Sequence, residues 1–380
     1  MGDTAYLDYN AGAPARPEVV AAMAEALGDG GNPSSVHAHG RRARKRMQDA
    51  RAAVAALAGA DPAGVVFTSG GTEANALVLS GCGRARVLVS AIEHPSVRDA
   101  VRDAEIVPVG ADGRVDLAAL DRRLAADDGP ALVSVMAANN ETGILQPVSE
   151  VARLARARGA LVHCDAAQAA GRVPLSMSDL GVDFLTLSAH KLGGPAGIGA
   201  VLLADPAFEL APMLHGGGQE RHRRAGTENL AGIVGFGIAA RIGKDDLSQG
   251  DAILVSRDLR DRLEAGARSR VPGARVIGAE SPRLPNTSML ALPGVPGQVQ
   301  VMALDLAGIM VSAGAACSSG KVAASAVLAA MGLAADVAAC AIRVSLGWGS
   351  APADVERFLG AWTALAERKG FDVYGAAEAA

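Results

Sequence analysis

The chain has 380 residues, and its 36 Lys and Arg residues against 40 Asp and Glu residues leave a net charge of −4 at pH 7. This balance argues against nucleic acid or an anionic membrane as the main partner, and the length favours a large domain with a smaller one. Four cysteines without a CxxC pair, no metal-like cluster, no signal-peptide pattern and no uninterrupted apolar span predict a soluble, cytoplasmic protein without a metal site.

Short runs rich in Val, Leu and Ile alternate with amphipathic segments over the first 200 residues. This alternation predicts an α/β domain with a largely parallel sheet. The predicted strands are residues 65–68, 86–90, 106–109, 131–136, 161–164, 184–188 and 199–203. The predicted helices include residues 41–57, 72–79, 95–102 and 149–158.

Residues 229–271 are predicted to be mostly helical, with a break at 244–251, and shorter strands and helices follow. We therefore expect a large α/β domain at residues 16–258. A smaller α+β domain is expected from residues 1–15 and 259–380.

Several polar residues follow the predicted strands, where parallel sheets place their ligands. Gly70, Gly71 and Thr72 open a helix, and the free N–H groups there attract anions, although such a turn is usually only a turn. His94 follows the strand at 86–90 and fits either stacking on a ring with proton exchange or simple packing in a loop. Asn140 lies in a turn and is a candidate only if other residues support it.

Asp165 and Gln168 follow the strand at 161–164. Asp165 could pair with a protonated pyridine nitrogen, or it could cap the start of a helix. Gln168 lies one turn further along, within reach of the same ring. Lys191 follows the strand at 184–188 among small residues. Burial lowers the pKa of an ammonium group, and a neutral amine forms a Schiff base with an aldehyde such as that of pyridoxal phosphate (PLP). The alternative for Lys191 is an ordinary surface lysine.

Taken together, these pieces resemble the cysteine desulfurases, which are PLP enzymes of the class V aminotransferase family. The resemblance covers nearly the whole chain, in order. The matching motifs are Leu7-Asp-Tyr-Asn-Ala11, Asn32-Pro-Ser-Ser-Val-His37, Thr68-Ser-Gly-Gly-Thr72, Glu93-His94, Asn139-Asn140-Glu141, Asp165 with Gln168, Ser188 to Lys191, Gly216-Gly-Gly-Gln-Glu-Arg221, Arg224-Ala-Gly-Thr227, Ser312 to Cys317 and Ile342 to Gly347.

The resemblance implies PLP fold type I and a role for each matched residue. Lys191 resembles the lysine that binds PLP and later carries protons, Asp165 the acid at the ring nitrogen, and His94 the histidine stacked on the ring. Gln168 would contact the ring oxygen. The residues that resemble the phosphate site are Gly71, Thr72, Ser188 and His190.

Three further matches concern the substrate and the partner subunit. Arg343 resembles the arginine that binds the substrate carboxylate, and Asn140 the asparagine near ring and substrate. Thr227 resembles a threonine that reaches the phosphate of the neighbouring subunit, which implies a homodimer with shared active sites.

Cys317 resembles the catalytic thiol that takes sulfur from L-cysteine as a persulfide and leaves L-alanine. Its Ala-Cys-Ser-Ser-Gly setting resembles the nitrogen-fixation and iron–sulfur-cluster branch, so a sulfur-acceptor or iron–sulfur scaffold protein is the implied partner. The other three cysteines, Cys82, Cys164 and Cys340, lie in or beside apolar stretches and are expected to be buried and inert.

The sequence departs from the family pattern at Ala11-Gly-Ala-Pro14, which lacks two hydroxyls that many relatives carry, and at Trp348. Three alternatives stay open: a selenocysteine lyase, a class V aminotransferase or epimerase, and a sulfur-relay scaffold without turnover. A nicotinamide-binding protein is excluded because the glycine fingerprint is missing. The sequence does not reveal the sulfur acceptor.

Overall fold

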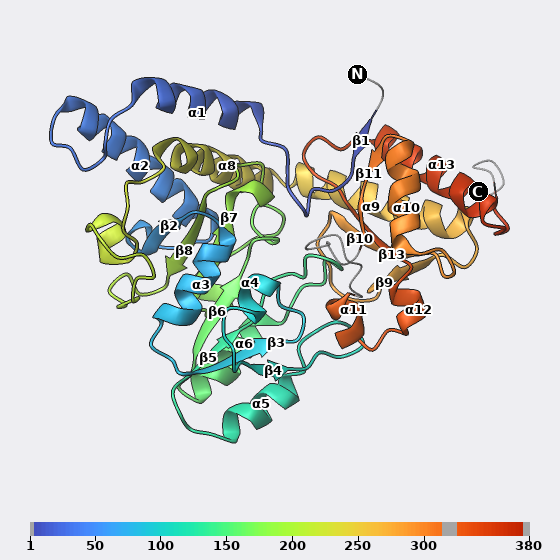
Figure 1. Cartoon of the computed structure of the whole chain (residues 1–380), viewed down its shortest axis with the longest axis horizontal. Helices are drawn as coiled ribbons and strands as arrows, with labels where there is room; N and C mark the ends of the chain where they lie inside the picture. Colours follow the sequence, from blue (N-terminus) through green and yellow to red (C-terminus); the bar gives the residue numbers. More distant parts are fainter. Residues whose placement is uncertain (1–3, 314–324, 375–380) are drawn as a thin grey trace.

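The computed structural model describes residues 4–313 and 325–374, and its centre is a seven-stranded sheet (Figure 1). The strands lie in the order β2-β8-β7-β6-β5-β3-β4. Every pair from β7 to β4 is parallel, and β8 runs antiparallel to both of its neighbours. The bounds are β2 (Val65–Thr68), β3 (Arg86–Ser90), β4 (Glu105–Val107), β5 (Ala131–Ser134), β6 (Leu161–Asp165), β7 (Phe184–Ser188) and β8 (Gly199–Leu203). The predicted α/β class with a mostly parallel sheet is confirmed.

Helices cover both faces of this sheet, because successive residues of each strand point to opposite sides. Val66 and Val201 face α3 (Gly71–Gly81), whereas Phe67 and Leu202 face a larger apolar core on the other side. The helices that contribute to this larger core are α1 (Pro17–Asp29), α2 (Ala38–Leu57), α5 (Leu117–Ala125), α6 (Val148–Ala157), α7 (Met177–Leu180) and α8 (Leu230–Gln249). The sheet is therefore the middle layer, and a ligand site is expected at one of its edges rather than on a face.

A second apolar core lies beside the first, on the right in Figure 1. It is built on a four-stranded sheet in the order β12-β13-β10-β9, with Phe358 and Trp362 stacked in its interior. The strands are β9 (Arg275–Ile277), β10 (Thr287–Ala291), β12 (Ser312–Ala313) and β13 (Ala341–Ser345). The helices of this part are α9 (Asp251–Arg270), α10 (Gly297–Leu306), α11 (Ala326–Ala330), α12 (Ala335–Ala338) and α13 (Pro352–Arg368).

The N-terminal segment joins the two parts. β1 (Ala5–Tyr6) pairs in parallel with β11 (Ile309–Met310), so the chain begins in the smaller part. Residues 7–13 then pass between the two cores, and Asp8 forms an isolated bridge with Ser345 (Figure 1). This crossing brings N-terminal backbone to the edge of the large sheet.

Some predicted bounds are corrected by the structure. The helix predicted at 95–102 is the single turn α4 (Pro95–Arg98), because the chain turns away and packs Val101 against the core. The predicted break at 244–251 shrinks to Gly250, whose φ of 80° suits glycine and separates α8 from α9. The division at residue 258 stays a prediction; that position lies inside the continuous helix α9.

Cys82, Cys164 and Cys340 are buried free thiols, as predicted. Cys317 lies outside the described residues. Within residues 4–313 and 325–374, none of the helices combines the length and apolar character needed to cross a bilayer.

A buried ion pair holds an unusual turn against the large sheet. Arg51 on α2 donates two hydrogen bonds to Glu220, at 2.7 and 2.9 Å, and Glu220 also accepts the N–H of Phe67 at 3.0 Å. Glu220 and its two successors, Arg221 and His222, have φ values of 45°, 57° and 65°, which are costly for residues other than glycine. The ion pair therefore stabilises a backbone conformation that these residues would otherwise avoid.

We predict that Glu220→Ala lowers the free energy of unfolding by about 3–5 kcal/mol, because it leaves the guanidinium of Arg51 buried without its partner. The matched control is Asp49→Ala, which breaks the exposed Lys45–Asp49 pair and should cost about 0.5 kcal/mol or less. Urea denaturation at one fixed protein concentration measures both. Equal losses in the two variants would contradict the prediction.

Candidate active site

A cavity of about 510 Å³ lies at the carboxyl edge of the large sheet, where the N-terminal segment and β13 close over it. Residues at or after the ends of β2, β3, β5, β6 and β7 meet there, as expected for a parallel sheet. The sequence-predicted residues that line the cavity are Gly71, Thr72, His94, Asn140, Asp165, Gln168, Ser188, His190, Lys191 and Arg343. The fold thus brings together ten residues drawn from a stretch of more than 270 positions.

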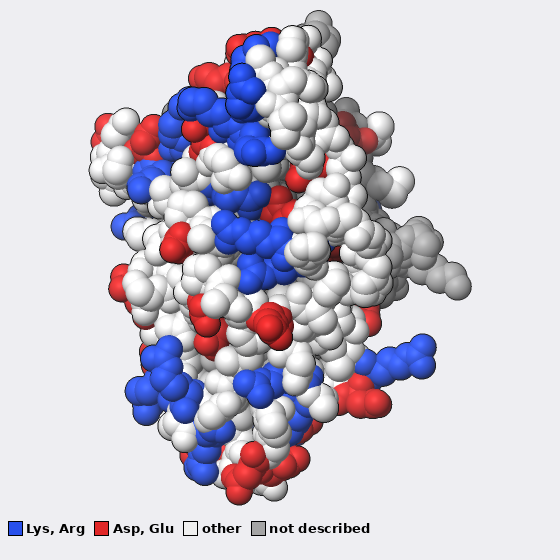
Figure 2. Space-filling view, turned by 90° about the vertical axis from the view of Figure 1, so that its left-hand side faces the viewer, with Lys and Arg blue, Asp and Glu red and all other residues white. Residues whose placement is uncertain are grey.

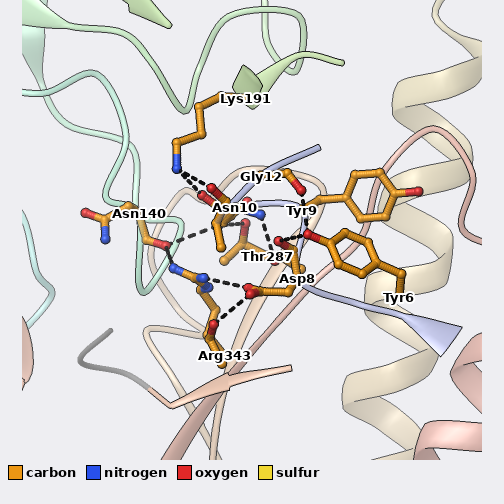
Figure 3. Close-up of polar contacts among 12 residues, drawn as sticks. Tyr6, Asp8, Tyr9, Asn10, Gly12, Asn140, Lys191, Thr287 and Arg343 are labelled. Carbon is orange, nitrogen blue, oxygen red and sulfur yellow. Dashed lines mark hydrogen bonds and ion pairs between the residues drawn. The ribbon is translucent and has the colours of Figure 1, made fainter. Parts of the chain in front are cut away.

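Lys191 reaches into the cavity from the turn after β7 (Figure 3). Its Nζ donates to the backbone oxygens of Asn10 at 2.7 Å and Ala11 at 2.9 Å. Burial, together with the cations of Arg343 and Arg172, lowers the pKa of Lys191 to about 8. A substantial fraction of this amine is therefore neutral, and nucleophilic, at mildly alkaline pH.

Asp165 is the last residue of β6, and its carboxylate accepts hydrogen bonds from neutral N–H groups. One carboxylate oxygen accepts the N–H of Ala167 at 2.9 Å, and the other accepts a hydrogen bond from the side-chain amide of Asn75 at 2.8 Å. The contact with Ala167 stabilises a turn at residues 167–172 rather than the start of a helix, so the N-cap considered as the alternative for Asp165 is not formed. The second oxygen keeps acceptor capacity for a cation in the cavity.

Gln168 lies one turn beyond Asp165 and is tied to the N-terminal segment. Its Nε2 donates to the backbone oxygen of Asn10 at 3.0 Å, and its Oε1 accepts a hydrogen bond from Arg172. The side chain is thus held at the cavity wall by protein groups.

His94 caps the short helix α4, and this contact fixes its tautomer. Its Nδ1 accepts the backbone N–H of Ser96 at 3.1 Å and lies 2.8 Å from the Ser96 hydroxyl. In the neutral ring the proton is therefore on Nε2. Burial lowers the pKa of His94, with Asp165 acting in the opposite direction.

One end of the cavity fits an anion such as a phosphate group. Helix α3 begins at Gly71 without a side-chain cap, so its first N–H groups are free to bind a negative charge. A Cβ on Gly71 would lie 3.2 Å from the Cβ of Ser188, so a larger residue there would crowd the wall. His190 also lines the cavity, and burial and the charge of Lys191 lower its pKa to about 4.

Arg343 enters the cavity from β13 and is nearly buried (Figure 3). It forms a 2.7 Å ion pair with Asp8 and donates to the backbone oxygen of Asn140 at 2.9 Å, while its Nε has no protein partner. Asp8 also accepts a hydrogen bond from Ser312 at 2.8 Å. Asp8 therefore orients the guanidinium and still leaves it donors for another group.

Four polar residues of the site were not assigned a role from the sequence: Asp8, Asn10, Asn75 and Arg172. Asp8 and Asn10 lie within a motif that carries the resemblance, and Asn75 lies three residues beyond the glycine turn, which was the available signal. Arg172, between Gly171 and Val173, belongs to no such motif, so the sequence offers no signal for it. It contacts Asn10, Gln168 and the backbone oxygen of Lys191, and burial lowers its pKa to about 9.

Two predicted residues are not part of this cavity. Thr227 is exposed and lines a separate cavity with Glu220 and Arg224. Cys317 lies outside the described residues. In the part of the chain that is described, no group of three or more His, Cys, Asp or Glu residues is arranged to hold a metal ion.

The two sequence departures contact residues next to the cavity or the N-terminal segment. A Cβ on Gly12 would be 3.6 Å from the His190 ring, and the Gly12 oxygen accepts a hydrogen bond from Tyr6. Trp348 donates to the backbone oxygen of Pro14 at 3.0 Å, and its ring lies 5.5 Å from the guanidinium carbon of Arg16. The Tyr6–Gly12 and Trp348–Pro14 hydrogen bonds therefore hold the N-terminal segment in place.

Comparison with known proteins gives one consistent family. A model of the class V aminotransferases matches residues 5–358. The cysteine desulfurase of Cereibacter sphaeroides is 43% identical over 369 residues, which are 93% of each chain. The IscS-like cysteine desulfurase of Mycobacterium tuberculosis is 40% identical over 373 residues, covering 93% of this chain and 94% of the relative.

Solved structures agree with these relatives. A NifS-like protein from Rickettsia africae superposes with a TM-score of 0.90 at 33% identity, covering 96% of this chain and all of the other. SspA in complex with cysteine superposes with a TM-score of 0.77 at 26% identity, covering 90% and 99% of the two chains.

We predict that the amine of Lys191 gains reactivity as the pH rises through about 8, roughly two units below an ordinary lysine. Below that pH the amine is an ammonium ion and does not attack electrophiles. An amine-directed label added to the ligand-free protein at a series of pH values, with mass spectrometry of the Lys191 peptide, measures the midpoint. A free lysine derivative in the same tube is the control, and a midpoint near 10 would contradict the prediction.

Proposed function

This chain belongs to the class V aminotransferase family and is a PLP-dependent cysteine desulfurase of fold type I, and we propose how its residues divide the work of that reaction. The proposed reaction converts L-cysteine and an enzyme thiol into L-alanine and an enzyme persulfide. One observation carries the proposal: Lys191, Asp165, His94 and Arg343 line a single cavity.

The cavity suits PLP at both of its ends. The uncapped start of α3, with Thr72, Ser188 and His190, would hold the phosphate, and Asp165 would pair with the ring nitrogen. Gln168 and Asn140 would lie at the ring edge, and Lys191 would hold the cofactor's aldehyde carbon. When bound, PLP supplies an electron-withdrawing ring that stabilises negative charge on the substrate carbon.

Lys191 and His94 are the proposed proton carriers. A pKa of about 8 lets Lys191 accept and return a proton near neutral pH. His94 has Nδ1 occupied by Ser96, so Nε2 is the nitrogen left to face a ligand. Its lowered pKa keeps the ring mostly neutral, which suits stacking and proton exchange.

Arg343 is the proposed anchor for the substrate carboxylate. A guanidinium binds a carboxylate through two parallel hydrogen bonds, and the Nε of Arg343 is a buried donor without a protein partner. Its contacts with Asp8 and Asn140 fix the plane of the group before substrate arrives. The substrate is thereby oriented toward Lys191.

We propose Cys317 as the thiol that takes the sulfur. This role rests on the family motif, because the residue lies outside the described part of the chain. The three described cysteines are buried, and burial raises the pKa of Cys82 and Cys164, so neither is suited to attack. The persulfide would then serve an iron–sulfur cluster scaffold or another sulfur acceptor, in a reducing cytoplasm where thiols stay unpaired.

A homodimer with shared sites is also proposed. Thr227 is exposed and lines a cavity with Glu220 and Arg224 rather than the one lined by Lys191. Figure 2 shows Lys and Arg side chains gathered at the middle of one face of the molecule, around acidic ones. Arg44, Arg51 and Arg221 line a hollow of about 410 Å³. Such a charged, indented face suits docking of a second copy whose phosphate site Thr227 would complete.

We predict that Cys317→Ala keeps its bound PLP and its yellow colour but loses sulfur transfer. L-cysteine is added, and alanine, sulfide and protein persulfide are measured. The matched control is Cys82→Ala, a buried thiol that should retain full activity. Native sulfur release by Cys317→Ala would contradict the role of this thiol, and a keto acid in place of alanine would indicate an aminotransferase.

Arg343→Gln is expected to lower kcat/KM for cysteine by roughly 10- to 100-fold, because about 1.5–3 kcal/mol of charged hydrogen bonding is lost. Arg343→Lys should not restore it, since an ammonium lacks the planar fork. The absorbance of bound PLP, unchanged in both variants, shows that the cofactor site is intact. An unaltered kcat/KM in Arg343→Gln would place the carboxylate elsewhere.

A further inference from the structure

A continuous chain of side-chain hydrogen bonds runs through the interior of the large sheet and ends at Asp165. Its other members lie side by side on β5, β6, β7 and α3 and are no more than 1% exposed. The contacts are Ser134 to His163 Nδ1 at 2.8 Å, His163 Nε2 to Thr186 at 3.1 Å, Thr186 to Asn75 Oδ1 at 2.5 Å, and Asn75 Nδ2 to Asp165 at 2.8 Å.

The direction of every bond in this chain follows from the charge on Asp165. An ionised carboxylate only accepts, so the Asn75 amide must present its NH₂ to Asp165 and its Oδ1 to Thr186. The Thr186 hydroxyl then donates to Asn75 and accepts from His163 Nε2–H.

The same logic fixes the far end. A His163 ring with its proton on Nε2 has a bare Nδ1, which accepts from the Ser134 hydroxyl. Burial lowers the pKa of His163 to about 4, so the ring is neutral and this arrangement holds at physiological pH. All four donors therefore point toward Asp165.

Asn75 also serves a second branch. Its Nδ2 donates to the Ser96 hydroxyl at 2.9 Å, and Ser96 contacts His94 Nδ1. Both amide hydrogens and the amide oxygen of Asn75 are thus used, and none is left for water. A reversed amide would set Oδ1 against the Asp165 carboxylate, so one orientation is strongly favoured.

We propose that Asn75, held in that orientation by Thr186 and His163, is a positioning residue that aims the Asp165 carboxylate into the cavity and orders the Ser96–His94 pair. The inference rests on the proposed pairing of Asp165 with the PLP ring nitrogen. It assigns one buried amide the task of aligning the acid and the histidine that face the cofactor from two different strand ends.

The test compares full-length variants by two readouts that do not need turnover. Asn75→Leu removes the hydrogen bonds at similar volume; Thr186→Val removes only the hydroxyl that orients Asn75, and Thr186→Ser keeps it. The first readout is the dissociation constant for PLP, and the second is the midpoint of the pH-dependent absorbance change of bound PLP. Asp165→Asn is the reference for loss of the acid.

We expect Asn75→Leu to weaken PLP binding roughly tenfold, and Thr186→Val roughly threefold, while Thr186→Ser stays near wild type. The absorbance midpoint should move in Asn75→Leu and Thr186→Val in the same direction as in Asp165→Asn. A general packing defect would not single out Val over Ser or move the midpoint in that direction. If Asn75→Leu does not fold, the Thr186 pair alone decides.

Two negative outcomes are distinguishable. If Asp165→Asn shifts the midpoint but Thr186→Val and Asn75→Leu do not, the positioning role of Asn75 is overturned and the assignment of Asp165 stands. If Asp165→Asn itself leaves affinity and midpoint unchanged, the pairing of Asp165 with PLP is wrong, and the present inference is overturned with it.

Discussion

The site depends on Asn10, a residue of the crossing segment whose polar groups are all paired. Its backbone oxygen accepts from Lys191 and Gln168 of the large part, and its N–H donates to Ser345 of the small part. Its side-chain amide contacts Thr287, Asn286, Arg172 and the backbone of Asn140. Because an unpaired buried polar group costs about 1–3 kcal/mol, one residue couples the position of the lysine to the docking of the two parts.

Charge explains why this junction suits its chemistry. Lys191 and Arg343 line one cavity, and Arg172 lies beside it, donating to the backbone oxygen of Lys191. Among the described side chains, Asp8 is the only carboxylate that pairs directly with one of these three cations. Their mutual repulsion adds to burial and lowers the pKa of both Lys191 and Arg172. The same excess of positive charge attracts anions, and a substrate carboxylate or a cofactor phosphate supplies them. One arrangement thus recruits an anion and keeps an amine partly neutral.

The sequence predicts the strands well because most are short, largely buried apolar runs, with the edge strand β4 as the exception. Lys191, Asp165 and His94 follow from their places at or after strand ends. It does not predict the contacts of Asn10 or Arg172. The Arg172–Asn10 and Lys191–Asn10 contacts join groups 162 and 181 positions apart, and no local pattern encodes them. The break predicted at residues 244–251 is too wide, since a single glycine with positive φ, Gly250, suffices to separate the two helices. Local sequence patterns predict the strands, the helices and the edge of the sheet where ligands bind. Which polar groups contact one another depends on the tertiary structure.

The polar residues inside the sheet form a pattern that a sequence-based prediction could use. His163 and Asp165 alternate on β6 and so share one face, and Ser134 and Thr186 are their register partners on β5 and β7. A polar residue within a buried strand is costly unless it is paired, so three of them in register beside an acid indicate a network. The network has one direction only while His163 is neutral. Burial lowers the pKa of His163 to about 4, so its deep placement in the core has a functional consequence. It keeps the ring neutral, and the donors therefore stay pointed at Asp165 near neutral pH.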